Sequence, residues 1–314
     1  MKLGCSSWSY HAAFREGRID LREWLRRCAE ELEVDGVELL DLHFPSTEAQ
    51  YLRELKRTCV DLKLTIAGIG VSNDFGADGR RVAEVEKVQH WCDIAAYLGA
   101  PIVRVFGGWS PAPVAAPESG RIVGLLRKVF GQGQPNARRL WSDVAWALRQ
   151  SADHAGERGV VLALQNNGPT GLIRGVTELQ QALHDVGSPW LRVCLDPASL
   201  PDTVGLDRVM PRVVQARARM REVRDDGSTA EAHWPELLRL LRAHGYRGSL
   251  LVDYEGAEDA ETAAPRAVRY LRGMLHLLER QQLLGTPAEH GTNGAGERTR
   301  AEAPAQARAS AGER

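Results

Sequence analysis

Polar side chains end four apolar segments in the second half of this chain. The segments are VVLALQNN, LRVCLD, VVQARAR and SLLVDYE, and their polar ends include Gln165, Asn167, Asp196, Arg217 and Glu255. Short segments rich in Val and Leu are typical of buried parallel strands, whose C-terminal ends meet at one edge of a sheet. Carboxylates, amides and a guanidinium that meet there can move protons and stabilise an anion. The sequence therefore predicts one site built from four strand ends.

The elements that must position these residues alternate regularly along residues 1–284. The expected strands span 2–6, 36–40, 64–71, 102–106, 160–165, 191–196, 213–217 and 249–252. Amphipathic segments between them predict helices, and Gly99, Gly159 and Gly245 follow three of these helices in the position of a C-cap. Eight β-α units in this length predict an α/β fold, a single (β/α)8 TIM barrel with its last helix over about 259–284. An open doubly wound sheet is the alternative, but no Gly-rich phosphate-binding motif follows the first strand.

Composition narrows the classes of partner. Apolar residues make up 43% of the 314 residues, and 40 Lys and Arg nearly balance 41 Asp and Glu, for a formal net charge of -1. This balance gives no electrostatic footprint for nucleic acid, and no segment has the length of a membrane span. The N-terminus lacks the apolar stretch of a signal peptide, so we expect a cytoplasmic protein with five reduced, buried cysteines. Residues 285–314 are rich in Gly, Ala, Pro and charge, and we expect a disordered tail there.

Further polar residues lie at or just beyond the other expected strand ends. We expect a polar cavity with aromatic edges, suited to a small carbohydrate-like substrate that makes hydrogen bonds and stacks on rings. The predicted substrate-binding residues are Asn73, Arg104, Gln165, Asn167, Arg219 and His43.

Ordered motifs along the chain resemble those of a known family. KLGCSSWSY, DGVELLDLHF, VSNDF, AAYLGAPIVRVFGG, LALQNNG, CLDPAS, VVQARAR and LLVDYEG follow one another over roughly residues 1–280. In this order they look like the sugar phosphate isomerase/epimerase group of xylose isomerase-like TIM barrels. The resemblance implies an enzyme that moves a proton next to a carbonyl through an enediolate, with a divalent metal, often Mn or Mg, at the strand ends.

The resemblance also implies where the metal ligands would lie, and two of the four positions depart from it. Asp196 and Glu255 match the ligands expected on the sixth and eighth strands. Gln165 stands where Glu is expected, and Arg217 stands where His is expected. Hard divalent ions favour anionic oxygen ligands and Arg cannot ligate, so we expect Asp196, Glu255 and Gln165 to hold a metal weakly at most.

These residues suggest roles in an enolisation. Glu255 is the expected general base, Asp196 the metal ligand or acid-base partner, and Arg217 the cation that stabilises an enolate oxygen. Gln165 cannot act as a second base, so β-elimination by a lyase or dehydratase remains an alternative to isomerisation or epimerisation. A sugar-binding protein without catalysis and an endonuclease for abasic DNA are further alternatives. The sequence also leaves a homo-oligomer open.

Two structural alternatives concern the charged residues themselves. Glu255 could serve only as the partner of Arg217 or Arg219 in an ion network. Both arginines alternate with alanine and so share one side of their strand, and if that side faces outward the electrophile hypothesis fails.

Overall fold

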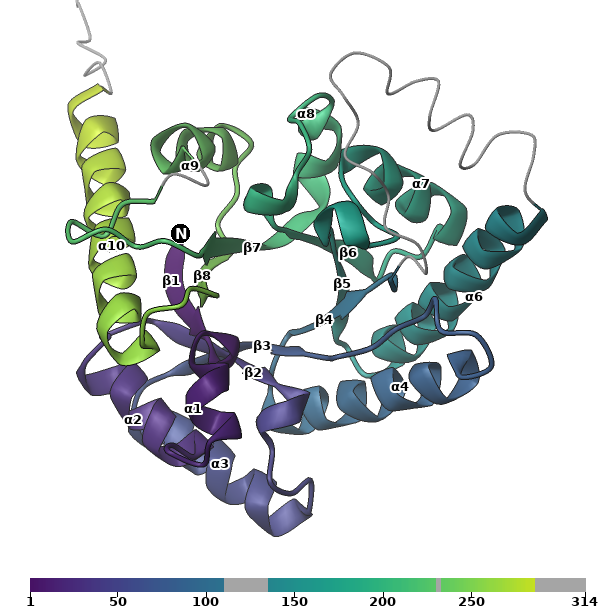
Figure 1. The fold of residues 1–314 in the computed structure, drawn as a ribbon, viewed down its shortest axis with the longest axis horizontal. Coiled ribbons are helices and arrows are strands. Elements are labelled where there is room, and N and C mark those ends of the chain that lie inside the picture. The colour runs from purple at the N-terminus through teal and green to yellow at the C-terminus, as the bar shows by residue number, and fades with distance from the viewer. Residues whose placement is uncertain (110–134, 230–232, 286–314) are drawn as a thin grey trace, which may run out of the picture.

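The eight expected strands form a closed parallel barrel in the order β1 to β8. The computed structural model describes residues 1–109, 135–229 and 233–285, and Figure 1 shows the helices arranged around the barrel. The strands are β1 (Lys2–Ser6), β2 (Gly36–Leu40), β3 (Thr65–Gly70), β4 (Ile102–Phe106), β5 (Val161–Gln165), β6 (Leu191–Leu195), β7 (Val213–Met220) and β8 (Ser249–Tyr254). The predicted TIM barrel is confirmed, and the open doubly wound sheet is excluded because β1 pairs with β8.

Helices follow the strands on the outside of the barrel. They are α1 (His11–Arg15), α2 (Leu21–Glu30), α3 (Ala49–Asp61), α4 (Arg81–Leu98), α6 (Pro135–Glu157), α7 (Val176–Val186), α8 (Leu206–Val209), α9 (Trp234–Ala243) and α10 (Ala260–Gly285). Gly99 caps α4 in the left-handed conformation at φ 83°, and Gly159 and Gly245 have positive φ just beyond α6 and α9. The glycine caps predicted from the sequence are therefore present.

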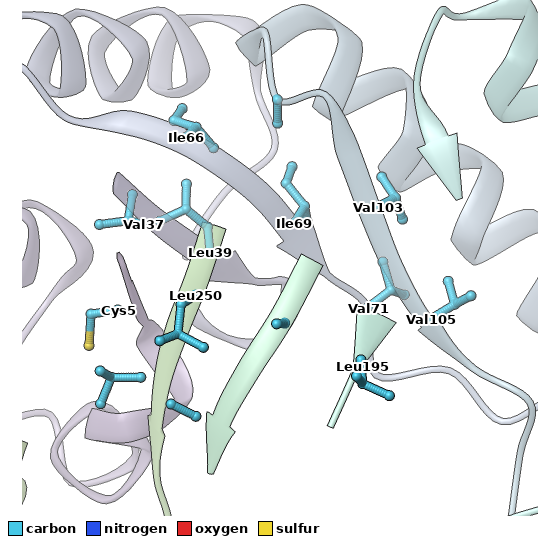
Figure 2. Close-up of a cluster of buried hydrophobic side chains, with 14 of the residues drawn as sticks. Cys5, Val37, Leu39, Ile66, Ile69, Val71, Val103, Val105, Leu195 and Leu250 are labelled. Atoms are coloured by element: carbon cyan, nitrogen blue, oxygen red, sulfur yellow. The ribbon is translucent and has the colours of Figure 1, made fainter. Parts of the chain in front are cut away.

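Side chains alternate along each strand between the helices and the barrel interior. Val37 and Leu39 of β2 are fully buried in the apolar core, whereas Glu38 between them joins the polar network of the interior. Figure 2 shows this apolar layer, to which neighbouring strands contribute Ile66, Ile69, Val103, Val105 and Leu250, among others. The layer buries one side of each strand and thereby aims the other side, with its polar residues, into the barrel.

The main difference from the predicted elements is the length of β7. The expected strand ended at Arg217, but β7 continues to Met220, with Arg219 paired to Asp253 and Met220 to Tyr254 of β8. The pairing keeps Arg217 and Arg219 on the same side of one strand, two positions apart. That side faces the barrel interior, so the outward alternative is wrong.

Several other sequence predictions can be compared with this fold. All five cysteines are free and buried, as expected. No helix within the described residues is long and apolar enough to cross a bilayer. The predicted disordered tail, except Gly285 at the end of α10, lies outside the described residues.

Candidate active site

A cavity of about 1130 Å³ opens at the C-terminal ends of the strands. Its lining includes the indole of Trp8 after β1, the ring of Phe106 at the end of β4, and Trp109 just beyond it. These rings can stack on the apolar face of a sugar. Residues from β5, β7 and β8 add polar groups to the same wall, so the predicted strand ends do converge. We call this region the mouth of the barrel.

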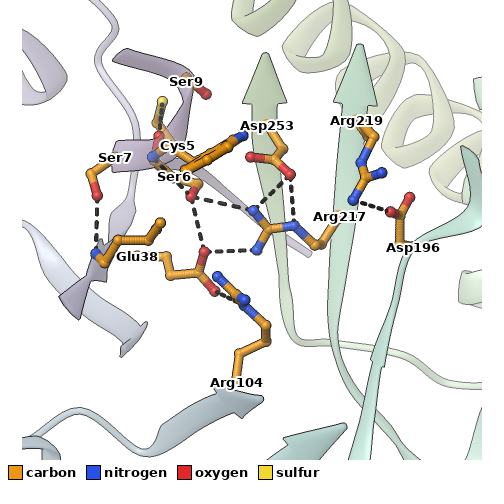
Figure 3. A network of polar contacts seen from close by, with 12 residues as sticks. Cys5, Ser6, Ser7, Ser9, Glu38, Arg104, Asp196, Arg217, Arg219 and Asp253 are labelled. Atoms are coloured by element: carbon orange, nitrogen blue, oxygen red, sulfur yellow. Dashed lines mark hydrogen bonds and ion pairs between the residues drawn. The ribbon is translucent and has the colours of Figure 1, made fainter. Parts of the chain in front are cut away.

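Arg219 lies between two carboxylates in the mouth. Its Nη2 forms an ion pair with Oδ2 of Asp196 at 2.8 Å, as Figure 3 shows, and its Nε lies 3.7 Å from Oε1 of Glu255. The indole N–H of Trp8 donates to the same Oε1 of Glu255 over 3.1 Å. Asp196, Arg219, Glu255 and Trp8 form what we call the Arg219 cluster.

The two carboxyl groups of the cluster are held differently. Asp196 is fully buried, absent from the lining of the cavity, and accepts a hydrogen bond from the hydroxyl of Ser199 at 2.7 Å. Glu255 lines the cavity, and its side chain is 24% exposed. Asp196 can therefore fix Arg219 from behind, whereas Glu255 can reach a molecule in the cavity.

Both carboxyl groups hold protons more tightly than usual. Burial raises the pKa of Asp196, although attraction to Arg219 and the hydrogen bond from Ser199 oppose the rise. Burial also raises the pKa of Glu255, and repulsion from the nearby Asp253 adds to the rise. A carboxylate with a raised pKa is a stronger base than an exposed one, which is the property that a proton-abstracting group requires.

A second charged network, centred on Arg217, lies deeper in the barrel than the Arg219 cluster. We call it the inner network. The guanidinium of Arg217 bonds to Asp253 at 2.9 Å through Nε and at 2.7 Å through Nη2, and to Glu38 at 2.7 Å through Nη1. Arg104 approaches the other oxygen of Glu38 at 3.6 Å, and Ser6 donates to Glu38 at 2.9 Å. Figure 3 shows the network drawn together from β1, β2, β4, β7 and β8.

The charges of this inner network stabilise one another. Burial alone would raise the pKa of Glu38, but the charges of Arg217 and Arg104 and the hydrogen bonds from Arg217 and Ser6 lower it to about 2. Burial opposes the charged form of Arg217, yet Asp253 and Glu38 raise its pKa well above the ordinary value. Arg217 is only 2% exposed. The cation that contacts both Asp196 and Glu255 is thus Arg219, whereas Arg217, which also lines the cavity, is paired with Glu38 and Asp253.

The predicted amide residues fall into two groups. Gln165 and Asn167 line the cavity, and among the described residues neither side-chain oxygen has a hydrogen-bond partner. Such buried acceptors can receive protons from the hydroxyl groups of a substrate. Asn73 also lines the cavity, but its amide exchanges hydrogen bonds of 2.8 and 2.9 Å with the backbone of Phe106. Asn73 therefore joins the ends of β3 and β4.

Two further predicted substrate-binding residues differ in their access to the cavity. Arg104 contributes to the lining, although it is 3% exposed and lies beside Glu38. His43 is outside the lining: its ring stacks on Phe14 at 4.1 Å and contacts His11 and the hydroxyl of Ser7. Burial and His11 lower the pKa of His43 to about 4, so this ring is neutral at physiological pH. The structure does not bring His43 to the other predicted residues.

Three residues of the site were absent from the predicted set. Asp253 shares the inward side of β8 with Glu255, and this two-residue spacing was a signal that the sequence offered. Asn166 brackets the backbone of Asp196, accepting from its N–H at 2.9 Å and donating to its carbonyl at 2.7 Å. Glu38 forms its ion pair with Arg217 across 179 residues of sequence, and no local pattern announces that contact.

The mouth does not offer the donor set that a divalent metal requires. Within the described parts of the chain, no three His, Cys, Asp or Glu residues are grouped to hold a metal ion. The two expected acidic ligands, Asp196 and Glu255, both face the guanidinium of Arg219. A divalent ion about 4 Å from that cation would meet a repulsion of about 8 kcal/mol at an effective dielectric constant of about 20. The unpartnered oxygen of Gln165 is neutral and cannot offset this repulsion.

Comparisons with known proteins agree with the barrel. A family model described as xylose isomerase-like TIM barrel matches residues 25–274 of this chain. A search of curated proteins finds no match.

Solved structures of similar fold include three sugar epimerases. A 3-keto-D-glucoside 4-epimerase from E. coli is 17% identical with a TM-score of 0.65, covering 88% of this chain and 99% of its own. An L-ribulose 3-epimerase is 16% identical with a TM-score of 0.67, covering 92% and 99%. A D-psicose 3-epimerase, solved in the presence of D-fructose, is 15% identical with a TM-score of 0.63, covering 91% and 100%. At these identities the likeness establishes the fold.

Proposed function

Because this chain belongs to the xylose isomerase-like TIM barrel family, we propose that it is an enzyme that isomerises or epimerises a sugar, cyclitol or related hydroxy-ketone. The observation that carries the proposal is Glu255, a carboxylate of raised pKa that faces a ring-walled cavity beside the guanidinium of Arg219. The sugar epimerases of similar fold support the class of substrate.

Glu255 is the proposed general base. It removes the proton from the carbon next to the substrate carbonyl, and the electron pair of that C–H bond moves to the carbonyl oxygen. Arg219 stabilises the negative charge that develops there, because a cation already in place beside the carbonyl oxygen favours the enolate over the neutral ketone. Trp8 holds the reactive carboxylate through its 3.1 Å hydrogen bond.

Return of the proton completes an isomerisation. Glu255 delivers it to the former carbonyl carbon of the enediolate, and the hydroxyl proton of the neighbouring carbon passes to the former carbonyl oxygen as the new carbonyl forms. One base on one face suffices for this transfer. Epimerisation requires a second acid on the opposite face, and Gln165 cannot supply that proton.

This same feature, an amide where a second carboxylate is expected, favours β-elimination as a second candidate. The first step is identical, and the enolate then expels a hydroxyl group from the next carbon. Glu255, protonated in the first step, gives its proton to the leaving hydroxyl, and water departs. The neutral Gln165, whose oxygen is unpartnered among the described residues, can position a hydroxyl without taking part in proton transfer.

The test is incubation of the purified protein with a panel of keto-sugars and inososes in D2O. The incubation is run with and without added manganese, and NMR detects the incorporated deuterium. We expect deuterium at the carbon next to the carbonyl. An isomeric or epimeric product supports the first candidate, and an unsaturated or dehydrated product supports the second. Binding of a sugar with no deuterium incorporation under either condition would contradict both and indicate a binding protein.

A further inference from the structure

Arg219 lies at the point that Asp196 and Glu255 share, where the family resemblance places a divalent ion. We propose that Arg219 replaces this ion: it excludes divalent metal from the mouth and itself supplies the positive charge to the substrate oxygen. The first half of the proposal concerns binding alone. The second half rests on the proposed function.

The exclusion follows from how the carboxylate oxygens are engaged. Oδ2 of Asp196 receives both Arg219 at 2.8 Å and the hydroxyl of Ser199 at 2.7 Å. Oε1 of Glu255 receives the indole N–H of Trp8 at 3.1 Å and faces Nε of Arg219 at 3.7 Å. A metal ion that bound these two oxygens would have to displace these donors. One that bound Oδ1 of Asp196, which has no hydrogen-bond partner among the described residues, would still lie beside the guanidinium. Since a guanidinium stays protonated and has no lone pair to offer, it would repel the ion without ligating it.

Two contacts hold Arg219 at the mouth, the strand pairing of its backbone and the ion pair of its guanidinium with Asp196. Its backbone pairs with Asp253 inside the longest strand of the barrel, and its partner Asp196 is fully buried and bracketed by the amide of Asn166. The side chain is nevertheless 14% exposed and lines the cavity. It can therefore touch a substrate oxygen, which the deeper Arg217, at 2% exposure and bound to Glu38 and Asp253, is less free to do.

A titration of the purified protein with Mn²⁺, monitored by calorimetry and by EPR, tests the exclusion of metal without reference to activity. We expect the wild type to bind no stoichiometric Mn²⁺. Arg219→His removes the cation and adds an imidazole to the two carboxylates, and we expect it to gain one site with affinity at least about 100-fold above the wild type. The guanidinium of Arg221 lies 4.0 Å from Oε2 of Glu255. Arg221→His, which adds an imidazole near the same carboxylate but keeps Arg219, should gain none.

Two further variants make the result decisive. Arg219→Gln, which removes the charge with less change of shape, should gain a weaker site. It serves as the test variant if Arg219→His folds poorly. Asp196→Asn combined with Arg219→His should lose the new site. Stoichiometric Mn²⁺ on the wild type that Asp196→Asn abolishes would overturn the proposal, and so would equal affinity of the wild type and both folded Arg219 variants.

The activity arm separates this proposal from the proposed function. Deuterium exchange by wild type treated with EDTA supports both. Exchange that requires added Mn²⁺ would overturn the replacement while leaving enolisation in place. If no exchange occurs but the metal titrations give the expected result, Arg219 still excludes metal from the mouth. Its proposed role toward the substrate oxygen would then fail together with the proposed function.

Discussion

At the residue scale Glu255 is held by a neutral donor, Trp8, in addition to the cations Arg219 and Arg221. The indole N–H of Trp8 reaches its Oε1 at 3.1 Å, and the same indole stacks on the ring of His11 at 4.2 Å. The hydrogen bond aims the carboxylate at the cavity and stabilises its charged form. The stack holds the indole in place.

Trp8→Phe should slow turnover while leaving the fold intact. The phenyl ring keeps the stack on His11 but removes the donor, a loss of about 1 kcal/mol or about a factor of five in rate. Trp109→Phe is the matched control, an aromatic change in the same cavity. Steady-state kinetics, on the substrate identified by deuterium incorporation, measures the effect. Equal losses in both variants would mean that the Trp8 hydrogen bond does not serve Glu255.

At the residue scale the sequence predicted which residues form the site better than it predicted their contacts. Asp196 and Glu255 were identified by their place at strand ends, and both belong to the Arg219 cluster. The role of cation was assigned to Arg217, because it stands where the family resemblance implies His at the end of the seventh strand. The observed β7 continues three residues further, to Met220, which places Arg219 at the mouth and Arg217 below it. Alternation fixes which side a residue takes, but depth along the strand depends on where the pairing ends.

At the scale of elements, Asn166 joins the ends of β5 and β6. It lies one residue beyond β5 and bonds to both backbone groups of Asp196, one residue beyond β6. Among the described residues, the side chain of the adjacent Asn167 makes only a 3.5 Å hydrogen bond, to the carbonyl of Gly108. The two neighbouring amides thus differ sharply in what they hold.

Asn166→Ala should destabilise the barrel by about 1–3 kcal/mol, since it leaves the buried backbone N–H of Asp196 without the acceptor it has in Asn166 and removes one of the two donors to its C=O, which keeps the N–H of Ser199 at 3.3 Å. Asn167→Ala should cost markedly less. Urea unfolding followed by circular dichroism measures both free energies of unfolding. A similar loss in the two variants would show that the bonds to Asp196 do not stabilise the joint between β5 and β6.

Element boundaries were predictable from the sequence where chemistry changed abruptly and less so elsewhere. β1, β2 and β4 match their expected limits, because apolar runs there give way to polar or glycine residues. β7 and β8 run on by three and two residues, since Arg219 and Asp253 are polar residues that remain inside a strand. Their mutual pairing across the sheet accounts for the extension, and pairing between Arg219 and Asp253, which are 34 positions apart, leaves no local sequence signal.

The inner network links the whole molecule. Glu38, Arg217, Asp253, Arg104 and Ser6 come from five strands that are distributed around the barrel, and their charges balance only when the barrel closes. The periodicity of the sequence predicts the closed barrel. It does not predict this network, whose members meet only in the finished fold.

Glu38 should make the whole barrel sensitive to acid. Its pKa is about 2 in the folded protein, below the ordinary 4.5 of the unfolded chain. The stability that this carboxylate contributes is therefore present above pH 4.5 and is lost as the pH falls toward 2. Glu38→Gln should lower stability at pH 7 by about 3 kcal/mol, and the gap from wild type should narrow across that interval.

Unfolding in urea at a series of pH values measures this gap. Glu30→Gln, an exposed change on α2, is the control and should track the wild type. Parallel curves for Glu38→Gln and wild type down to about pH 2 would contradict the assignment of a low pKa to Glu38.

The most direct test of the account is deuterium exchange by Glu255→Gln in D2O with EDTA present, on the keto-sugar or inosose that the wild type labels. We expect the wild type to incorporate deuterium next to the carbonyl and Glu255→Gln to be slower by about 10²–10⁴-fold, because the amide cannot take the proton. Asp202→Asn, another carboxyl-to-amide change in the lining, should keep the wild-type rate. Exchange by Glu255→Gln at the wild-type rate would contradict the account.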